Sequence, residues 1–558
     1  MITESRTIQK NKLSNNLGDI LKNLNEKNIH IEQNAKKSTA RNEKKPEIKL
    51  FNTASKSKEI FNPISKKNVK IYACGPTVYR SPHVGNARSF VVFDCLFRLM
   101  KFYYPKVSYV RNVTDIDDKI IIEAKKLNIE FKDLTKNVFK NFKKDCADLN
   151  VLDPTHEPFA TNFIDKIIED IEILIKNGFA YVSDDNLELN SNGSENTQGN
   201  SLEYKTEHSS KNKNENKDES NDQNAFIKSQ DLCKSSSIDL KSQHVFFEIS
   251  KYEEYLKFSG KSDLLSGARI EKNDLKKSDQ DFVLWKPSED VYWESPWGRG
   301  RPGWHIECTT MSKSILGFPF DIHCGGQDLI FPHHTNEIAQ TWGMCQKKCA
   351  NYWIHNNFVN MNNEKMSKSI GNTLLLKDVL ENHNPMVVRL FLLMAHYRHP
   401  MNWTESGLDE ASNIYKKWSK KLIGIQPGNP TEEFIEIISD DLNTTTAIKK
   451  ISKDLKSLQN EINKSGLNDQ KEIDSARRTE SNYVSEKLCR IAANCSLIGI
   501  IFEANDQILT EEIEILIEKR KMFKKEKMYA KADEIRDKLK ENGISIKDTK
   551  NGTEWEKD

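Results

Sequence analysis

The chain has 558 residues, of which 30% are charged and 37% hydrophobic, and its formal net charge is +2. A chain of this length exceeds one ordinary hydrophobic core, so we expect about three or four domains. The nearly balanced charge excludes a globally basic nucleic-acid-binding protein, and any nucleic-acid surface must be a local patch.

The scattered cysteines and the absence of long apolar runs indicate the compartment. The ten cysteines lack the dense, even spacing of a secreted disulfide scaffold. No run approaches the about 18 apolar residues of a membrane span, and the N-terminus lacks the apolar core of a secretory signal. We therefore predict a cytoplasmic protein without membrane association. Organelle targeting is a minority alternative, because acidic residues such as Glu4 and Asp19 are untypical of transit peptides.

The first ordered element is predicted near residue 69. Residues 1–68 are rich in Lys, Asn and Ser and show little apolar periodicity, which predicts a disordered extension. Val69–Ala73 reads as a strand that ends at a Gly-Pro breaker, residues 87–102 as a helix, and Val107–Val113 as a second strand. This βαβ order predicts a parallel sheet.

The rest of the chain divides by composition. Residues 184–243 return to Ser, Asn, Lys and Glu, which predicts a disordered insertion whose ends lie close together. We therefore assign 69–385 to a catalytic domain. Helical patterns follow, and we divide them into a bundle at 386–504 and a C-terminal region at 505–558.

The segment Pro82–Arg88 (PHVGNAR) lies between the first strand and its helix. Backbone N–H groups and the positive end of a helix at such a turn can receive phosphate, so His83, Gly85 and Asn86 are candidate ATP contacts. An ordinary turn is an equally good interpretation of this segment alone.

The segment Lys365–Asn372 (KMSKSIGN) carries two lysines in a predicted mobile loop. Lys365 and Lys368 can neutralise a leaving pyrophosphate, although a solvated charge cluster would explain the segment if it stood alone. Residues 311–314 repeat the letters MSKS, but the surrounding apolar residues predict a helix face, and we reject them as a phosphate loop.

Together, these two loops resemble the paired signatures of class I aminoacyl-tRNA synthetases. The resemblance implies an α/β Rossmann-type parallel-sheet catalytic domain with insertions, followed by a mostly helical tRNA-binding region. It also implies catalytic roles for His83, Asn86, Lys365 and Lys368, with Mg²⁺ accompanying ATP. Asn86 departs from the histidine that is usual at the fourth position of the first signature.

Four further runs are similar to the cysteinyl-tRNA synthetases within that class. They are Tyr72–Tyr79 (YACGPTVY), Asn112–Lys119 (NVTDIDDK), Gly300–Cys308 (GRPGWHIEC) and Phe331–Glu337 (FPHHTNE). The resemblance implies that ATP and L-cysteine form cysteinyl adenylate and that tRNA(Cys) then accepts the cysteinyl group.

The same runs contain a candidate metal site. His333 and Glu337 are spaced i, i+4 on one predicted helical face, and cysteine, histidine and carboxylate side chains are all acceptable zinc ligands. The resemblance selects Cys74, Cys308, His333 and Glu337 for one Zn²⁺ per chain, with His334 as a rival ligand. Zinc binds sulfur readily and lowers the pKa of a bound thiol, so we expect it to select cysteine over serine without an editing domain.

Several other residues receive weaker assignments. The resemblance implies ATP contacts at Gly325 and Asp328. The substrate contacts that it implies are Gly75, Thr77, Thr114 and Trp304. A second zinc site at Cys345 and Cys349, or at His323 and Cys324, is disfavoured because too few ligands converge in the sequence.

The C-terminal helix and the residues after it are rich in lysine and resemble an anticodon-binding region. Arg520, Lys524 and Arg536 are candidate phosphate contacts, and Trp555 could stack on an unpaired base. A solvated charged helix is the alternative interpretation.

Two other functions remain open at this point. A cysteine ligase that transfers its adenylate to a small amine would lack the full anticodon region, and a non-enzymatic RNA-binding protein would be expected to lose the phosphate-loop or zinc residues. We expect a monomer, and the residues themselves leave the oligomeric state open.

Overall fold

The computed structural model describes residues 46–183, 242–260, 274–361, 364–365, 373–465, 473, 483–502, 504–525, 528–541, 544–549 and 552–557. Most of the predicted N-terminal extension, nearly all of the predicted insertion and Lys368 lie outside these residues. Among the described helices, none combines the length and the apolar character needed to cross a membrane.

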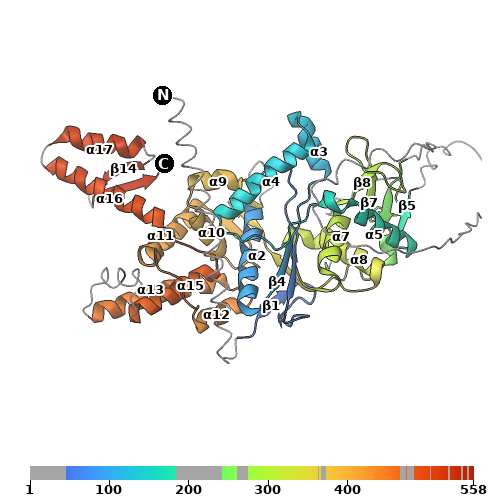
Figure 1. Ribbon diagram of the computed structural model, residues 1–558, viewed down its shortest axis with the longest axis horizontal. Helices are drawn as coiled ribbons and strands as arrows, with labels where there is room; N and C mark the ends of the chain where they lie inside the picture. Colours follow the sequence, from blue (N-terminus) through green and yellow to red (C-terminus); the bar gives the residue numbers. More distant parts are fainter. Residues whose placement is uncertain are drawn as a thin grey trace, which may run out of the picture.

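A four-stranded sheet forms the centre of the molecule (Figure 1). All neighbouring pairs are parallel, and helix α2 (Val84–Tyr103) connects the first two strands in sequence, which confirms the βαβ unit. The spatial order is β10-β9-β3-β4, so the chain leaves β3 for β4 on one side and later returns to β9 on the other. Such a reversal opens a crevice at the carboxyl ends of β3 and β9, where ligands bind in folds of this kind. The strands are β3 (Val69–Ala73), β4 (Val107–Arg111), β9 (Phe320–Gly326) and β10 (Ala350–Asn356).

The N-terminal boundary of the fold differs from the sequence prediction. β1 (Lys49–Asn52) pairs antiparallel with β2 (Ser57–Ile60), and Ile48 and Leu50 are buried in the main core. Thr53 also donates its N–H to the carbonyl oxygen of Trp353 on β10, at 2.9 Å. The prediction of disorder is therefore wrong for residues 46–68. The few apolar residues of the hairpin gain stability from burial against the sheet, and a composition dominated by lysine hides this signal.

The chain between β4 and β9 builds a separate antiparallel layer and most of its covering helices (Figure 1). The sheet order is β5-β6-β7-β8. Ser183 N–H donates to the carbonyl oxygen of His244 at 2.9 Å, so the two ends of the predicted insertion lie side by side as loop closure requires. The elements are α3 (Asp118–Leu127), α4 (Phe131–Asp148), α5 (Ile164–Lys176), α7 (Trp304–Leu316), β5 (Ala180–Val182), β6 (Val245–Phe247), β7 (Phe282–Pro287), β8 (Gly300–Pro302) and the 3₁₀ turns at Ala160–Phe163 and Ile249–Lys251.

Between β9 and β10 the chain forms a compact helical corner. A 3₁₀ turn (Gln327–Leu329) leads into a π turn (Ile330–His334) and then helix α8 (Thr335–Cys345). The backbone is kinked at Phe331, whose φ of −136° and ψ of 131° are not helical, and the kink sets the direction in which α8 begins.

The region after β10 is helical, as predicted, but it shares the core of the catalytic domain. Buried residues of α2, α10 and α15 belong to one hydrophobic cluster, which runs from Ile48 to Ile500. The short strand β13 (Met401–Trp403) also pairs with β11 (Val359–Met361), which pairs with β12 (Glu364–Lys365). The boundary that we placed at residue 385 is therefore not a break in packing. The helices are α9 (Leu376–Asn382), α10 (Pro385–Met394), α11 (Glu405–Leu422), α12 (Glu432–Ser439), α13 (Thr444–Lys464) and α15 (Tyr483–Leu497).

The C-terminal region has its own small core. Helices α16 (Ala504–Lys525) and α17 (Tyr529–Glu541) pack with the hairpin of β14 (Ile544–Thr549) and β15 (Gly552–Lys557). It lies at the end of the molecule opposite the antiparallel layer (Figure 1).

Candidate active site

Cys74 lies directly after β3, at the crevice formed where the strand order reverses. The other predicted metal ligands come from elements that close over this point. Cys308 is on α7, His333 is in the π turn, and Glu337 is in the first turn of α8. The structure thus brings together four residues that are far apart in the sequence, and their candidate ligand atoms all lie within 4.8 Å of one another.

The distances among these side chains match a tetrahedral zinc shell. Zn–S bonds of about 2.3 Å at tetrahedral angles place two sulfur atoms about 3.8 Å apart, and Cys74 Sγ and Cys308 Sγ are 3.9 Å apart. Ligand nitrogen and oxygen atoms about 2.1 Å from zinc lie about 3.4 Å apart, and His333 Nε2 is 3.1 Å from Glu337 Oε1. The donor set and its spacing therefore fit this metal.

Two further histidines, His323 and His334, lie next to these four residues. His323 Nε2 lies 2.9 Å from Glu337 Oε2, and His334 Nε2 lies 3.3 Å from Cys74 Sγ. Cys74, His323, His334 and Glu337 form an alternative ligand group of the same compactness. His334 Nδ1 is 2.7 Å from His355 Nε2, so the ring of His334 is held from both sides. We take His323 and His334 as partners that orient ligands, because such outer hydrogen bonds are the rule around bound metals.

Burial and mutual charge set the protonation of the cluster. The Cys74 thiol donates to Cys308, which lowers the pKa of Cys308 to about 6, while burial raises the pKa of Cys74 well above its usual value. Burial opposes ionisation of Glu337, yet His323 and His333 lower its pKa to about 2. Burial disfavours the charged form of His333, but Glu337 and Cys308 raise its pKa to about 10. The cluster thus carries negative charge that suits a cation. It also holds protons that metal binding would displace into solution.

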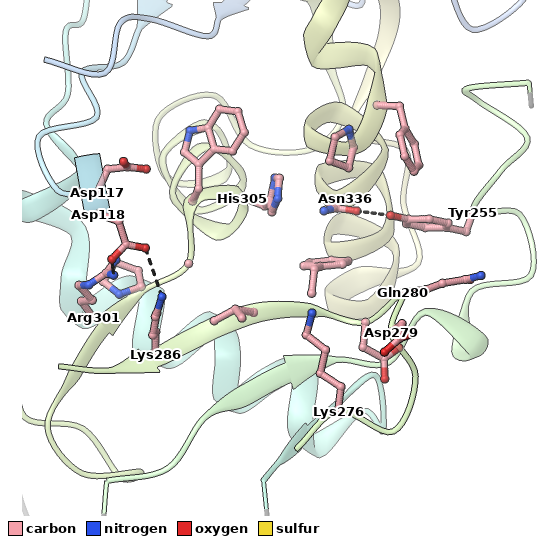
Figure 2. A pocket seen from close by; sticks show the side chains of 18 residues that line it. Asp117, Asp118, Tyr255, Lys276, Asp279, Gln280, Lys286, Arg301, His305 and Asn336 are labelled. Carbon is pink, nitrogen blue, oxygen red and sulfur yellow. Dashed lines mark hydrogen bonds and ion pairs between the residues drawn. The ribbon is translucent and has the colours of Figure 1, made fainter. Parts of the chain in front are cut away.

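Trp304 forms a wall next to these ligands. Its ring stacks on the His333 ring, with centroids 4.2 Å apart and planes at 28°. Trp304 and His305 also line a cavity of about 200 Å³. Figure 2 shows this cavity, where Asn336 accepts a hydrogen bond from the hydroxyl of Tyr255 at 2.5 Å and Asp118 faces Lys286 and Arg301. The indole therefore lies next to both the ligand cluster and an open cavity.

The loops after β3 and β4 run side by side at the same edge. Thr77 pairs with Thr114 as an isolated parallel bridge, and Gly75 N–H donates to Asn112 Oδ1 at 2.9 Å. A Cβ atom on Gly75 would lie 1.7 Å from the carbonyl oxygen of Asn112, so only glycine fits there. Three predicted substrate contacts thereby lie in one pair of loops next to Cys74.

The first signature caps helix α2. His83 is the N-cap residue, and its Nδ1 accepts from the N–H of Asn86 at 3.3 Å, while Asn86 Oδ1 accepts from the N–H of His83 at 3.2 Å. This reciprocal capping box gives a physical reason for asparagine at the fourth position. Burial lowers the pKa of His83, and nearby Asp328 acts in the opposite direction. His83 and Asp328, predicted separately as ATP contacts, are thus neighbours.

The segment that follows the second signature pairs with the first signature. Lys365 is in β12, and the chain returns to the described residues at Thr373. Immediately afterwards, Val84 N–H donates to the carbonyl oxygen of Leu374 at 3.1 Å, and Leu376 N–H donates to that of Pro82 at 2.9 Å. The segment that follows the second signature therefore reaches the start of α2, within the first signature.

Other sequence assignments have mixed outcomes. Lys313 in the rejected MSKS repeat forms an ion pair with buried Asp170, which agrees with a helix face. Among the described residues, no cluster of candidate metal ligands includes Cys345 or Cys349. A Cβ on Gly325 would lie 2.5 Å from His334 Cε1, so this glycine leaves room for a histidine of the cluster.

The C-terminal basic residues are partly engaged within the protein. Arg520 is buried and forms a bidentate ion pair with Asp548, at 2.9 and 3.0 Å, and Lys524 lies 2.6 Å from the same carboxylate. This pairing contradicts a direct phosphate contact by Arg520, whose role is to fix the hairpin on α16. Arg536 is exposed on α17, and Trp555 packs against the small core of this region.

Sequence reasoning assigned no role to several residues at the cluster. His305 Nδ1 lies 2.9 Å from His333 Nδ1, and buried Glu307 accepts from Thr114 Oγ1 at 3.1 Å. Both belong to a run that resembles the family, but a single sequence gives no signal that separates them from core residues.

Comparisons with known proteins point to one family. The family model described as tRNA synthetases class I (C) catalytic domain matches residues 60–235 and 230–413. A cysteine–tRNA ligase of Wolbachia pipientis wMel is 40% identical over 523 residues, which cover 91% of this chain and 99% of that protein. The cysteine–tRNA ligase of Pelagibacter ubique (strain HTCC1062) is 38% identical over 529 residues, covering 91% and 99%. Among solved structures, Mycobacterium tuberculosis methionyl-tRNA synthetase in complex with methionyl-adenylate aligns at a TM-score of 0.49 and 14% identity, over 77% of this chain and 89% of that one.

Proposed function

The chain belongs to the cysteine–tRNA ligase family of class I aminoacyl-tRNA synthetases, and we propose that it activates L-cysteine with ATP and transfers it to tRNA(Cys). The observation that carries the proposal is the convergence of Cys74, Cys308, His333 and Glu337 at the crevice between β3 and β9. A cluster rich in sulfur ligands next to a small, aromatic-walled space suits an amino acid that itself carries a thiol.

We propose Zn²⁺, one per chain, as the resident metal of the cluster. When bound, zinc would supply a Lewis acid that holds the substrate sulfur as a thiolate, a form that the serine hydroxyl does not readily adopt. His323 orients Glu337, and His334 with His355 supports Cys74, so the ligands are held in place before any substrate arrives. Trp304 walls the space next to His333 and limits the size of the side chain that enters.

The two signatures are proposed to hold ATP, which carries Mg²⁺. The start of α2 offers backbone N–H groups and the positive end of the helix dipole to the phosphates. His83 supplies a neutral imidazole, since its pKa is lowered by burial. Lys365 and Lys368 would balance the charge of the departing pyrophosphate. Gly325 in β9 and Asp328 in the 3₁₀ turn that follows would contact the nucleotide.

The reaction then follows from this placement. The cysteine carboxylate attacks the α-phosphorus of ATP, which forms the mixed anhydride cysteinyl adenylate and releases pyrophosphate. The terminal ribose hydroxyl of tRNA attacks the activated carbonyl carbon, and AMP leaves. Because the protein holds the carboxylate and the α-phosphate together, the reaction step avoids the entropic cost of bringing two molecules together in solution. We propose that Lys524, Arg536 and Trp555 face the tRNA near its anticodon.

Two assays test the proposal in order. Cysteine-dependent exchange of labelled pyrophosphate into ATP tests activation, and transfer of labelled cysteine to tRNA(Cys) tests the second step. We expect both. Absence of exchange in protein with a full complement of zinc would contradict the proposal, and exchange without transfer would instead indicate a ligase for a small amine.

A further inference from the structure

Three lysines form one side of helix α4, and the metal cluster and the two signatures leave them without a role. Lys132, Lys136 and Lys140 follow one another at intervals of four residues, and all three are exposed. We call these three residues the α4 lysine face. Because an α-helix turns once in about 3.6 residues, the face points away from the buried side of the helix, which consists of Leu134, Thr135, Val138, Phe142, Asp145 and Cys146.

The positive charge of the α4 lysine face is not neutralised within the protein. Among the described residues, none of its three lysines forms an ion pair, whereas Lys144, one turn further along, pairs with Asp148 at 2.9 Å. The other acidic residues of α4 do not balance the face, because Asp145 is buried and Asp133, although exposed, has no ion pair in the described part of the chain. Like charges at i, i+4 spacing repel one another and weaken a helix. The arrangement therefore suits a negatively charged partner from outside the chain.

Helix α4 lies at the edge where the active site opens. Its buried side packs in one hydrophobic cluster with Val78 and Val113, which are in the loops after β3 and β4. It also contacts α9, the helix that follows the second signature. In Figure 1, α4 lies between α3 and α9, and the C-terminal region lies further along in the same direction. The lysine face is thus exposed on the surface between the crevice and the C-terminal region.

A tRNA that acts in the proposed reaction has to cross this surface. Its terminal ribose must reach the adenylate in the crevice, while its anticodon is proposed to lie on the C-terminal region. Each phosphate of the RNA backbone carries a negative charge, which lysine side chains can neutralise. The formal net charge of the whole chain is only +2, so attraction for a polyanion must come from local patches of this kind.

We propose that the α4 lysine face binds the phosphate backbone of tRNA between the acceptor end and the anticodon. This inference rests on the proposed function, because it assumes that one tRNA spans the crevice and the C-terminal region. The bound phosphates replace the repulsion among the lysines by attraction. Phosphate contacts position an RNA without reading its sequence, so the face contributes affinity and orientation and does not select tRNA(Cys) over other tRNAs.

The experiment measures tRNA binding by the full-length protein at several KCl concentrations. The variant combines Lys132→Ala, Lys136→Ala and Lys140→Ala, and fluorescence anisotropy gives the dissociation constant for tRNA(Cys). Each phosphate contact contributes about 0.7–0.9 to the slope of log affinity against log salt, so the slope should fall by about 2–3. An exposed charge pair contributes about 1.4- to 5-fold, so the three changes together should weaken binding by about 3- to 100-fold. Cysteine-dependent pyrophosphate exchange, which needs no tRNA, should be unchanged and reports that the variant is folded.

Helix α13 offers a matched control. Lys449, Lys453 and Lys456 are exposed on one side of this helix and form no ion pair among the described residues. Figure 1 shows α13 on the lower side of the view, well away from α4 on the upper side. Replacing these three lysines with alanine removes the same charge. We expect the affinity for tRNA(Cys) to stay within about twofold, because charges more than about 10 Å from a partner are largely screened by salt.

A second variant keeps the charge of the α4 lysine face. Lys132→Arg, Lys136→Arg and Lys140→Arg together should bind tRNA(Cys) with the affinity and salt slope of the unaltered protein, since arginine also neutralises phosphate. An unchanged slope and affinity in the alanine variant would overturn the inference, as would an equal loss in the α13 control. Binding to anionic lipid vesicles that the alanine variant loses, with tRNA affinity unchanged, would also overturn it. If the unaltered protein itself lacks exchange or binds no tRNA, the proposed function fails, and the inference fails with it.

Discussion

Val84 donates its backbone N–H to the carbonyl oxygen of Leu374 at 3.1 Å. This bond joins the first residue of α2, which lies within the first signature, to the segment that leaves the second signature. The segment that leaves the second signature is therefore anchored at the N-terminus of α2. The chemistry proposed for ATP depends on that anchor, which the capping box of His83 and Asn86 holds in place.

Asn86→Ala should weaken the start of α2. Asn86 Oδ1 accepts from the N–H of His83, and its loss removes one half of the capping box. We expect a loss of about 0.5–2 kcal/mol in the free energy of unfolding, together with a lower kcat/KM for ATP in pyrophosphate exchange. Asn86→Asp keeps an acceptor and should retain most of the stability. Equal stability of the alanine variant and the unaltered protein in urea denaturation would contradict the capping role.

Lys368→Ala should slow activation without preventing the protein from folding. A lysine that balances developing charge on pyrophosphate contributes about 100- to 1,000-fold to the rate of such a step. The matched control is Lys313→Ala in the MSKS repeat, where the lysine is paired with Asp170 and lies on a helix. We expect the control to exchange pyrophosphate within about twofold of the unaltered rate, because Lys313 is engaged by Asp170 and lies outside the second signature. A similar loss in both variants would show that the second signature has no special role.

Metal affinity should rise with pH. In the metal-free cluster, His333 holds a proton because its pKa is raised to about 10, and burial keeps Cys74 in the thiol form. Cys308, with its pKa lowered to about 6, is already mostly ionised at pH 7. A metal that binds all four residues therefore displaces about two protons at neutral pH, and a third below about pH 6. Titration of zinc in buffers of different ionisation enthalpy measures this number, and binding without proton release would contradict the ligand assignment.

Arg389→Met should destabilise the whole catalytic unit. The Arg389 guanidinium is fully buried, pairs with Asp94 on α2, and donates to the carbonyl oxygens of Ile498 and Leu149. Removing it leaves the Asp94 carboxylate buried beside fewer partners. We expect this to lower the free energy of unfolding by about 3–5 kcal/mol.

The double variant Asp94→Asn with Arg389→Met should recover part of the loss measured by thermal unfolding. Removing both members avoids an unpaired buried charge. No recovery would indicate that the backbone bonds of Arg389 carry the effect.

Much of the α/β unit could be predicted from local patterns. Val69–Ala73 and Val107–Arg111 are short β-rich runs with a helical pattern between them, and they form parallel neighbours as expected. The hairpin at Lys49–Ile60 could not be predicted in this way, because its strands are stabilised by distant contacts such as the one between Thr53 and Trp353. The shared core of the catalytic and helical regions is likewise a tertiary property.

The residues of the candidate site could likewise be predicted from the sequence only in part. His333 and Glu337 are close in sequence, so their common helical face could be predicted, and resemblance supplied Cys74 and Cys308. The partners that hold them were not assigned, because His323 reaches Glu337 only through the pairing of β9 with the helical corner that follows it. Arg520 was assigned to RNA from its charge, and its ion pair with Asp548 depends on a hairpin that packs back onto α16.

The central claim is that a zinc ion bound by Cys74, Cys308, His333 and Glu337 selects cysteine. Its most direct test is the ratio of cysteine-dependent to serine-dependent pyrophosphate exchange in native, metal-stripped and zinc-restored protein. Binding pockets without a metal distinguish such similar side chains by only about 10- to 200-fold, so we predict a much larger ratio in the native and restored forms and a collapse of cysteine-dependent exchange in the stripped form. An unchanged ratio after complete removal of the metal would contradict the account.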